Sequence, residues 1–230
     1  MSKKYRVRKV FFWSFMLVLM MFVSCTVSKT AQKLGWSNLL ANGLAGFSTP
    51  YGDWGIEDGQ LILPANTNKK QRTDIWLNGD YGDFKLELDF KVGKGTNSGI
   101  FFRTSDIKDP VQTGIEVQIR DDYGKSPIDK HFCGSVYDIK EVSENRVKKA
   151  GEWNHIQITC LGNKINVILN GGEVVDINLN YWKDIGKNPD GTENKFGTAY
   201  NVMSQKGKIG FQDHPGAGGV WYKNIRIKEL

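Results

Sequence analysis

Hydrophobic and polar residues alternate with a period of two through most of the chain. The segments 86–91, 115–120 and 221–227 place apolar side chains at every second position. Each is predicted to be a strand with one side against a core and the other open to water or ligand. The segment 156–175 continues this pattern between glycine-containing turns, as is typical of an antiparallel meander. A helix is predicted only within 138–149.

These elements predict an all-β fold of two antiparallel sheets packed face to face. Many short strands with hairpin spacing, and no regularly alternating helices, argue against a βαβ fold. From Trp36 onwards we find no linker, low-complexity tract or convincing internal repeat, so residues 36–230 are interpreted as one domain, large enough to bury a single core. Curved sandwiches often bind ligands on one sheet, which draws attention to the polar positions of 115–120.

The first residues predict export. Basic residues at positions 3–9 precede an apolar run at 10–23, which is shorter than the roughly 20 residues that a bilayer span needs. The small Ser24 then precedes Cys25, as in the lipobox of bacterial lipoproteins. We therefore predict a lipoprotein signal peptide (1–24), a lipidated Cys25 that anchors the protein at the cell envelope, and a tether (25–35). An ordinary signal peptide or an uncleaved anchor remains the alternative.

The leader changes the charge of the mature protein. The formal charge of +6 includes five basic residues of the leader and no acidic ones, so the residues from 25 onwards carry about +1. A nearly neutral domain lacks the basic surface that phosphate-backbone binding requires, and nucleic acid is not expected as a partner. The other cysteines, Cys133 and Cys160, have no zinc-site spacing, and either a disulfide or free thiols would fit.

Several stretches together resemble one family, the 3-keto-disaccharide hydrolase domain family. The resemblance covers nearly all of the mature chain and keeps its motifs in order. The stretches are WGIEDGQLIL (54–63), TDIWLNGDYGDFKLELDFKV (73–92), NSGIFFRT (97–104), GIEVQIRDD (114–122), GSVYDI (134–139), GEWNHIQITCLGNKINVILNGGEVVD (151–176), GKIGFQDH (207–214) and YKNIRIKEL (222–230). The resemblance implies an exported, often lipid-anchored, concanavalin-like jelly roll that acts on glycosides oxidised at C3.

The implied chemistry is proton abstraction beside a carbonyl group. A ketone at C3 acidifies the C2 hydrogen, so the glycosidic oxygen on C1 leaves by elimination and water is added afterwards. Such a site needs a base, an acid for the leaving oxygen, and a cation or donors for the enolate oxygen. The expected partner is an oligosaccharide or glycoside. No cofactor or metal site is predicted, although acidic loops such as 106–109 leave a divalent cation open.

Three residues are the catalytic candidates. Arg103 offers paired donors to sugar oxygens or an enolate, and its alternative is an ion pair with a strand neighbour such as Glu116. Glu116 and Gln118 lie two apart and project to the same face, which fits a base beside a hydroxyl binder, although a solvated strand face gives the same pattern. His214 is predicted to move a proton because imidazole titrates near neutrality.

The substrate-binding candidates surround these residues. Strand geometry predicts that Gln212 and His214 face one way at the rim of the groove and Asp213 the other. His131 lies in a loop before GSVYDI, and Tyr137 and Trp76 offer flat faces to sugar rings, although such aromatics are also common in cores. The full set assigned to substrate binding is Gln118, Gln212, Asp213, Tyr137, His131 and Trp76.

Two other functions fit the same fold. A non-catalytic carbohydrate-binding module would share the aromatic residues and the polar face, but it would not need a base such as Glu116 or His214. An ordinary glucanase needs paired carboxylates across the glycosidic bond. The segment 87–92 begins such a signature but ends in Val92, where the second glutamate would stand.

Overall fold

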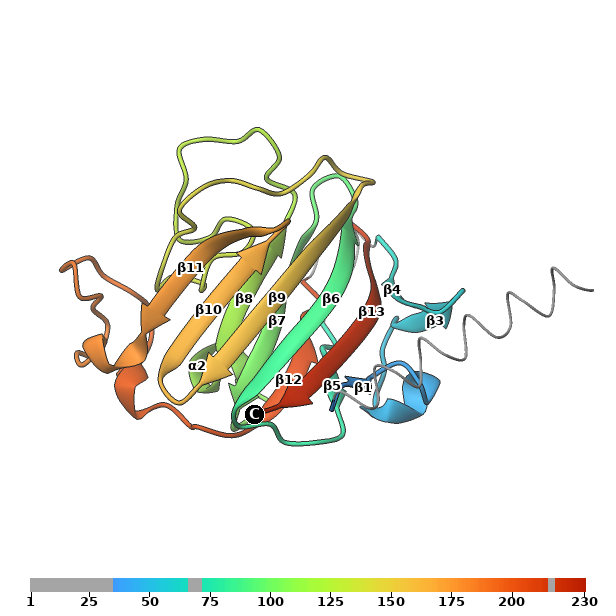
Figure 1. Ribbon diagram of the computed structural model, residues 1–230, viewed down its shortest axis with the longest axis horizontal. Coiled ribbons are helices and arrows are strands. Elements are labelled where there is room, and N and C mark those ends of the chain that lie inside the picture. The colour runs from blue at the N-terminus through green and yellow to red at the C-terminus, as the bar shows by residue number, and fades with distance from the viewer. Residues whose placement is uncertain (1–34, 66–71, 215–217) are drawn as a thin grey trace, which may run out of the picture. The chain divides into compact units, whose positions relative to one another are not determined.

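The computed structural model describes residues 35–65, 72–214 and 218–230. Cys25, the predicted signal peptide and nearly all of the predicted tether lie outside the described residues. Within the described part of the chain, no helix is both long and apolar enough to cross a membrane. The account below concerns the unit Asn38–Leu230, whose strands are labelled in Figure 1.

The larger sheet has the antiparallel order β11-β10-β9-β6-β13-β4-β3. Its central strands place apolar residues opposite one another. For example, Leu86 of β6 lies opposite both Ile158 and Ile227. Shared register of this kind keeps these apolar side chains on one face. The strands are β3 (Gly55–Glu57), β4 (Gln60–Leu63), β6 (Phe84–Val92), β9 (Trp153–Leu161), β10 (Lys164–Leu169), β11 (Gly172–Asn178) and β13 (Val220–Glu229), and β1 (Ser37–Asn38) begins the described chain.

The smaller sheet has the order β2-β5-β12-β7-β8. Its strands are β2 (Phe47–Ser48), β5 (Ile75–Leu77), β7 (Asn97–Thr104), β8 (Ile115–Arg120) and β12 (Lys208–Phe211). Short helical turns occupy the connections: η1 (Gly43–Gly46), α2 (Pro110–Thr113), η2 (Leu179–Tyr181) and η3 (Tyr200–Val202). In Figure 1, β7, β8 and β12 lie behind the strands of the larger sheet.

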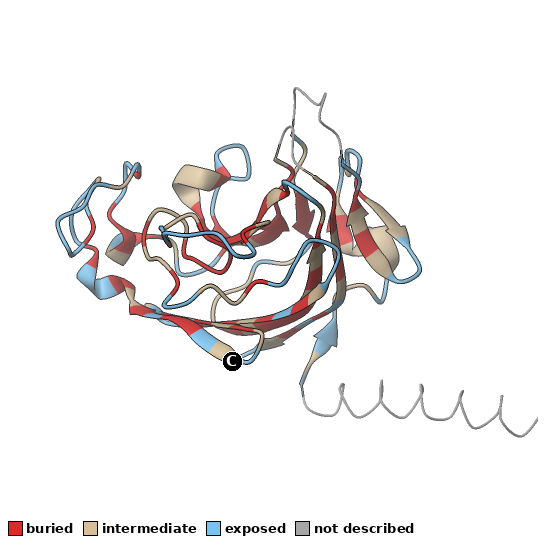
Figure 2. Ribbon diagram, turned by 90° about the horizontal axis from the view of Figure 1, so that it is seen from above, coloured by how far each residue is buried: buried red, intermediate tan, exposed pale blue. Residues whose placement is uncertain are grey.

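The core lies between the two sheets. Figure 2 shows buried residues along the strands of both layers. Phe84 of β6 meets Phe102 of β7 edge to face, with ring centroids 5.7 Å apart. Such aromatic pairs add to the free energy gained by burying their area. The predicted all-β sandwich of two antiparallel sheets is confirmed. Cys133 and Cys160 are both buried free thiols.

The helix predicted within 138–149 is wrong. This segment consists of turns and irregular structure. Only its first N–H groups bond to the preceding turn, since Ile139 and Lys140 both donate to the Val136 carbonyl. Further along, Val147 donates to Asn145 Oδ1 (3.3 Å) and Lys148 donates to Asn154 Oδ1 (2.8 Å). Asparagine side chains commonly compete with helix formation in this way.

The polar face of 115–120 was predicted to be open to water or ligand, but Glu116 and Gln118 are buried on it, with exposed fractions of 6% and 2%. The segment that follows β8 turns back and runs beside it. Gly134 donates to the Gln118 carbonyl (2.8 Å), and Tyr137 donates to the Glu116 carbonyl (2.9 Å). The strand therefore has hydrogen-bonded neighbours along both sides.

Candidate active site

One row of residues crosses four strands on the face of the smaller sheet that points away from the core. Trp76 of β5 lies opposite Gly210 of β12, Gly210 lies opposite Phe101 of β7, and Phe101 lies opposite Glu116 of β8. Cross-strand partners share a face of the sheet. Trp76 and Phe101 are buried but do not belong to the core cluster between the sheets. The row therefore brings Trp76 and Glu116 onto one surface.

Two glycines make room for the side chains of this row, because they have no side chain of their own. A Cβ atom on Gly210 would lie 2.4 Å from the ring of Trp76, and a Cβ atom on Gly99 would lie 2.2 Å from Glu116 Oε1. The indole of Trp76 is stacked on Phe101 at 5.8 Å between centroids. Because Trp76 is only 5% exposed, it forms a floor and not a projecting platform for a sugar ring.

Glu116 is a buried carboxyl group on this face. Burial raises the pKa of Glu116 to about 8, a rise that nearby Asp74 reinforces. The charge of Lys195 acts most strongly in the opposite direction, followed by the charge of Arg72 and a hydrogen bond from the Gln212 side chain. At neutral pH the carboxyl group is therefore mostly protonated, and it can donate a proton.

A second carboxyl group, Asp74, lies where the chain enters β5. Its Oδ1 accepts the backbone N–H of Asp213 (2.9 Å), and Arg72 Nη2 lies 3.8 Å from its Oδ2. Burial raises the pKa of Asp74, whereas the charges of Arg72 and His214 lower it. The structure therefore brings His214 close to Asp74, which in turn acts on Glu116.

The GFQDHPG stretch differs from its predicted strand geometry. β12 ends at Phe211, and Gln212 continues the ladder only by donating its N–H to the Gly99 carbonyl (2.8 Å). Gln212 and Asp213 are both buried, and His214 is half-buried. Asp213 Oδ2 accepts the backbone N–H of Thr73 (2.9 Å), so Asp213 fastens the end of β12 to the start of β5.

A loop on the other side of Glu116 carries His131 and Tyr137. Their rings are 4.8 Å apart, and His131 Nε2 lies 3.3 Å from Asp138 Oδ1. Lys195 Nζ lies 3.1 Å from the Tyr137 hydroxyl oxygen and 4.2 Å from the centroid of its ring. Because Tyr137 also bonds to the Glu116 backbone, this group borders the row described above.

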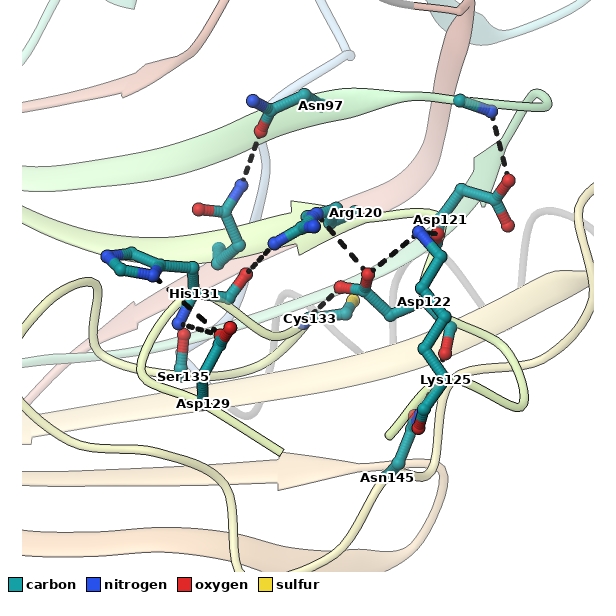
Figure 3. Close-up of polar contacts among 12 residues, drawn as sticks. Asn97, Arg120, Asp121, Asp122, Lys125, Asp129, His131, Cys133, Ser135 and Asn145 are labelled. Carbon is teal, nitrogen blue, oxygen red and sulfur yellow. Dashed lines mark hydrogen bonds and ion pairs between the residues drawn. The ribbon is translucent and has the colours of Figure 1, made fainter. Parts of the chain in front are cut away.

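Figure 3 shows how the loop that carries His131 is fixed to the end of β8. The fully buried Asp122 accepts the N–H of Cys133 (3.1 Å) and pairs with Arg120 Nε (3.3 Å) and Lys125 Nζ (3.2 Å). Arg120 Nη1 also donates to the His131 carbonyl (3.2 Å). Paired and hydrogen-bonded in this way, a buried carboxylate can hold a loop in one position.

Arg103 does not join these residues, and its predicted alternative partner, Glu116, is not its partner either. Its guanidinium is fully buried and donates to Asp83, two backbone carbonyls and Gln205. Gln118, which was predicted to bind a sugar hydroxyl beside Glu116, also has partners within the protein. Its Nε2 donates to Asn97 Oδ1 and to the Ser98 carbonyl. The geometry gives both side chains structural partners.

The sequence interpretation missed Arg72, Asp74 and Lys195. The sequence could have indicated Asp74, because it precedes Trp76 by two residues and a period of two places both on one face. No sequence pattern indicated Arg72 or Lys195, since each reaches the site from an irregular segment. Among residues 35–65, 72–214 and 218–230, no three His, Cys, Asp or Glu side chains are grouped so that they could hold a metal ion.

Gly99→Ala tests the packing of Glu116. The new Cβ would overlap the present position of Oε1, so we expect the carboxyl group to move and the catalytic rate to fall at least about 10-fold, since misplaced catalytic groups lose rate steeply. Cleavage kinetics and thermal unfolding measure the two effects. Gly55→Ala is the control, because its Cβ would meet nothing within 4 Å. Unchanged kinetics in Gly99→Ala would contradict a role for this packing.

Comparison with known proteins shows the family to which the chain belongs. The chain is 27% identical over 205 residues to a 3-keto-disaccharide hydrolase of Bacteroides thetaiotaomicron, a match that covers 77% of this chain and 70% of that protein. A provisionally named glycosyl hydrolase of Parabacteroides distasonis has a similar crystal structure, with a TM-score of 0.76, 33% identity, and coverage of 85% of this chain and 99% of that one.

A more distant structure shares the fold alone. It is a Bacillus subtilis protein with a galectin-like fold, 13% identical, with a TM-score of 0.55 and coverage of 84% of this chain and 94% of that one. The family model for the 3-keto-alpha-glucoside-1,2-lyase-like domain matches residues 35–228. Because that match spans nearly the whole of the described domain, the chain belongs to the 3-keto-alpha-glucoside-1,2-lyase-like domain family.

Proposed function

We propose that this protein cleaves 3-keto-glycosides, such as 3-keto-disaccharides, by elimination followed by hydration. The observation that carries the proposal is the buried Glu116, whose pKa is raised to about 8, on a sheet face that it shares with Trp76. Family membership and the name of the Bacteroides thetaiotaomicron relative support the substrate class. The separate prediction of export and a lipid anchor at Cys25 would place this activity at the cell envelope.

The proposed reaction assigns one role to each of two residues. His214 removes the proton on C2, and the electron pair of that C–H bond forms the enolate with the C3 carbonyl. When the carbonyl re-forms, a double bond forms between C1 and C2 and the bond from C1 to the glycosidic oxygen breaks. Glu116, protonated at neutral pH, gives its proton to that oxygen. Water then adds at C1 and gives a proton to the Glu116 carboxylate, while C2 takes up a proton from His214, so that the free 3-keto sugar forms and both residues are restored.

The remaining polar groups would bind the sugar around this centre. Trp76 supplies a flat apolar floor, and Gln212 supplies an amide beside Glu116. His131 and Tyr137 border the opposite side of the row. These residues would supply the base and the acid that proton abstraction next to a carbonyl group needs, together with a floor for the sugar ring.

Cleavage of oxidised and unoxidised sugars tests the function. We expect the purified protein to cleave 3-keto-trehalose or 3-keto-lactose but neither unoxidised parent, since only the ketone acidifies C2. In D₂O, mass spectrometry should detect deuterium at C2. His214→Ala should lower kcat/KM by about 10²–10⁴-fold, the usual loss for a general base.

The alternative function gives a different result. A non-catalytic carbohydrate-binding module would bind a sugar measurably and cleave none of the four. His214→Ala would then change affinity at most. Cleavage of the unoxidised parents at a similar rate would contradict the elimination mechanism, because their C2 hydrogens are not acidic.

A further inference from the structure

The proposed elimination passes through an enolate, whose negative oxygen needs a nearby cation or strong donors. The sequence offered Arg103 for this role, but its guanidinium lies buried among structural partners. Two cations instead act on Glu116, namely Lys195 and Arg72, and Lys195 has the larger effect. The other contacts of these two cations show which of them is available to bind a ligand.

Arg72 is already paired with a carboxylate, because its Nη2 lies 3.8 Å from Asp74 Oδ2. The ammonium group of Lys195 instead contacts uncharged groups, the hydroxyl oxygen (3.1 Å) and the ring face (4.2 Å) of Tyr137. An ammonium group over an aromatic face keeps its charge and remains able to donate further hydrogen bonds. Lys195 is also an exposed residue, so a ligand can reach it.

The backbone of Lys195 is fixed on both sides although it lies in a loop. Its N–H donates to Asp138 Oδ2 (2.9 Å), and its carbonyl accepts from Gln112 Nε2 (3.2 Å). Gln112 Oε1 in turn accepts the N–H of Gly197 (3.0 Å). Side chains from two other segments therefore hold the position from which the ammonium group extends toward Tyr137. Such support is typical of residues whose placement matters for function.

We propose that Lys195 binds the C3 oxygen of the oxidised sugar and stabilises the negative charge that develops there when C2 loses its proton. This rests on the proposed function above. Tyr137 connects the two halves of the site, since its side chain contacts Lys195 and its backbone N–H bonds to the Glu116 carbonyl. Lys195 is thus the cationic partner of the acid Glu116 and the base His214.

Lys195→Met tests the proposal because it removes the charge and keeps an unbranched side chain. We expect kcat/KM for the 3-keto sugar to fall about 10²–10³-fold, the usual loss when one donor to a developing oxyanion is removed. The rate of C2 deuterium exchange should fall with it, while the affinity for the unoxidised parent stays within about 3-fold. Lys195→Arg should recover at least about 10-fold of the loss. Lys183→Met, in the same loop and also exposed, should match wild type.

The pH profile tests whether the charge of Lys195 acts on Glu116 in the working protein. Loss of the Lys195 charge removes the strongest influence that lowers the pKa of Glu116, so the alkaline limb of the profile should move to higher pH in Lys195→Met. The other ionisable groups that interact with Glu116 are unchanged by this substitution, and they are Arg72, Asp74, Tyr200 and Tyr222.

Each outcome separates this inference from the proposed function. If wild type cleaves 3-keto sugars and Lys195→Met does so equally well, only the role of Lys195 is wrong. If Lys195→Met loses affinity for the unoxidised parent as much as it loses kcat/KM, Lys195 binds sugar without stabilising the enolate, and the inference is also wrong. If wild type exchanges no C2 hydrogen and cleaves no 3-keto sugar, both fail together.

Discussion

Glu116→Gln is expected to lower kcat/KM for a 3-keto-disaccharide by about 10²–10⁴-fold, because an amide cannot give a proton to the leaving oxygen. The amide keeps the shape of the carboxyl group and the space over Gly99. Burial holds the pKa of Glu116 at about 8, so the wild-type protein should be most active below that pH and lose activity as Glu116 ionises above it. Initial rates between pH 5 and 10 measure both effects.

The same profile separates an acid from a base at this position. If Glu116 were the group that removes the C2 proton, activity would rise through pH 8 and level off above it, since only the carboxylate form would work. Such a rise would exchange the roles assigned to Glu116 and His214. A substrate with a good leaving group, such as a 3-keto nitrophenyl glycoside, should partly rescue Glu116→Gln, because its departure needs little help from an acid.

Glu116 also links pH to stability. Its pKa in the folded protein is raised from 4.5 to about 8, so the folded state binds the proton more tightly than the unfolded state does. Its contribution to stability is therefore fully present below about pH 4.5 and is lost as the pH rises toward 8. Relative to Glu116→Gln, the wild-type unfolding free energy should fall over this interval. Urea titrations at pH 5 and pH 8.5 would show a higher relative stability of the variant at the higher pH.

The sandwich could be predicted from the sequence because alternation with a period of two has one simple explanation, a sheet with a buried face. The same alternation correctly placed Glu116 away from the apolar core face of its strand. It could not show that Glu116 and Gln118 would be buried on the opposite face of β8, because burial depends on residues distant in sequence. Burial, and with it the raised pKa, became visible only in three dimensions.

The site residues illustrate the same limit. Glu116 and Trp76 share a row because four strands align in register, which no local pattern encodes. Lys195 enters from a long irregular connection, where sequence carries little information on direction. Arg103 was misjudged because a cation at the end of an apolar strand has the same sequence pattern whether it faces a ligand or a buried turn.

Arg103→Met is expected to lower the free energy of unfolding by about 1.5–3 kcal/mol, the usual contribution of hydrogen bonds to a charged group, because the guanidinium is fully buried while its ion-pair partner Asp83 is 38% exposed. The guanidinium connects three separate segments. In the first, Nη2 donates to Asp83 Oδ1 (2.8 Å) and Nε to the Gly82 carbonyl (3.1 Å), and in the second, Nη1 donates to the Gly162 carbonyl (2.7 Å). Nη1 also donates to Gln205 Oε1 (3.0 Å). A methionine fills much of the buried space of the guanidinium but cannot donate to these acceptors, which then rely on water.

Chemical denaturation and the cleavage assay together decide what Arg103 does. Arg146→Met is the matched control, because Arg146 also pairs with a glutamate, Glu144, but the two side chains are 35% and 55% exposed. Exposed pairs contribute little, so we expect this control to lose less than about 1 kcal/mol. If Arg103→Met unfolds at the same denaturant concentration as wild type and yet loses cleavage, the structural role is wrong and the catalytic role predicted from sequence is restored. We expect the reverse, a protein that is less stable and retains its kcat in the molecules that remain folded. Arg103 supports the turns at one end of the sandwich and does not take part in the row that carries Glu116.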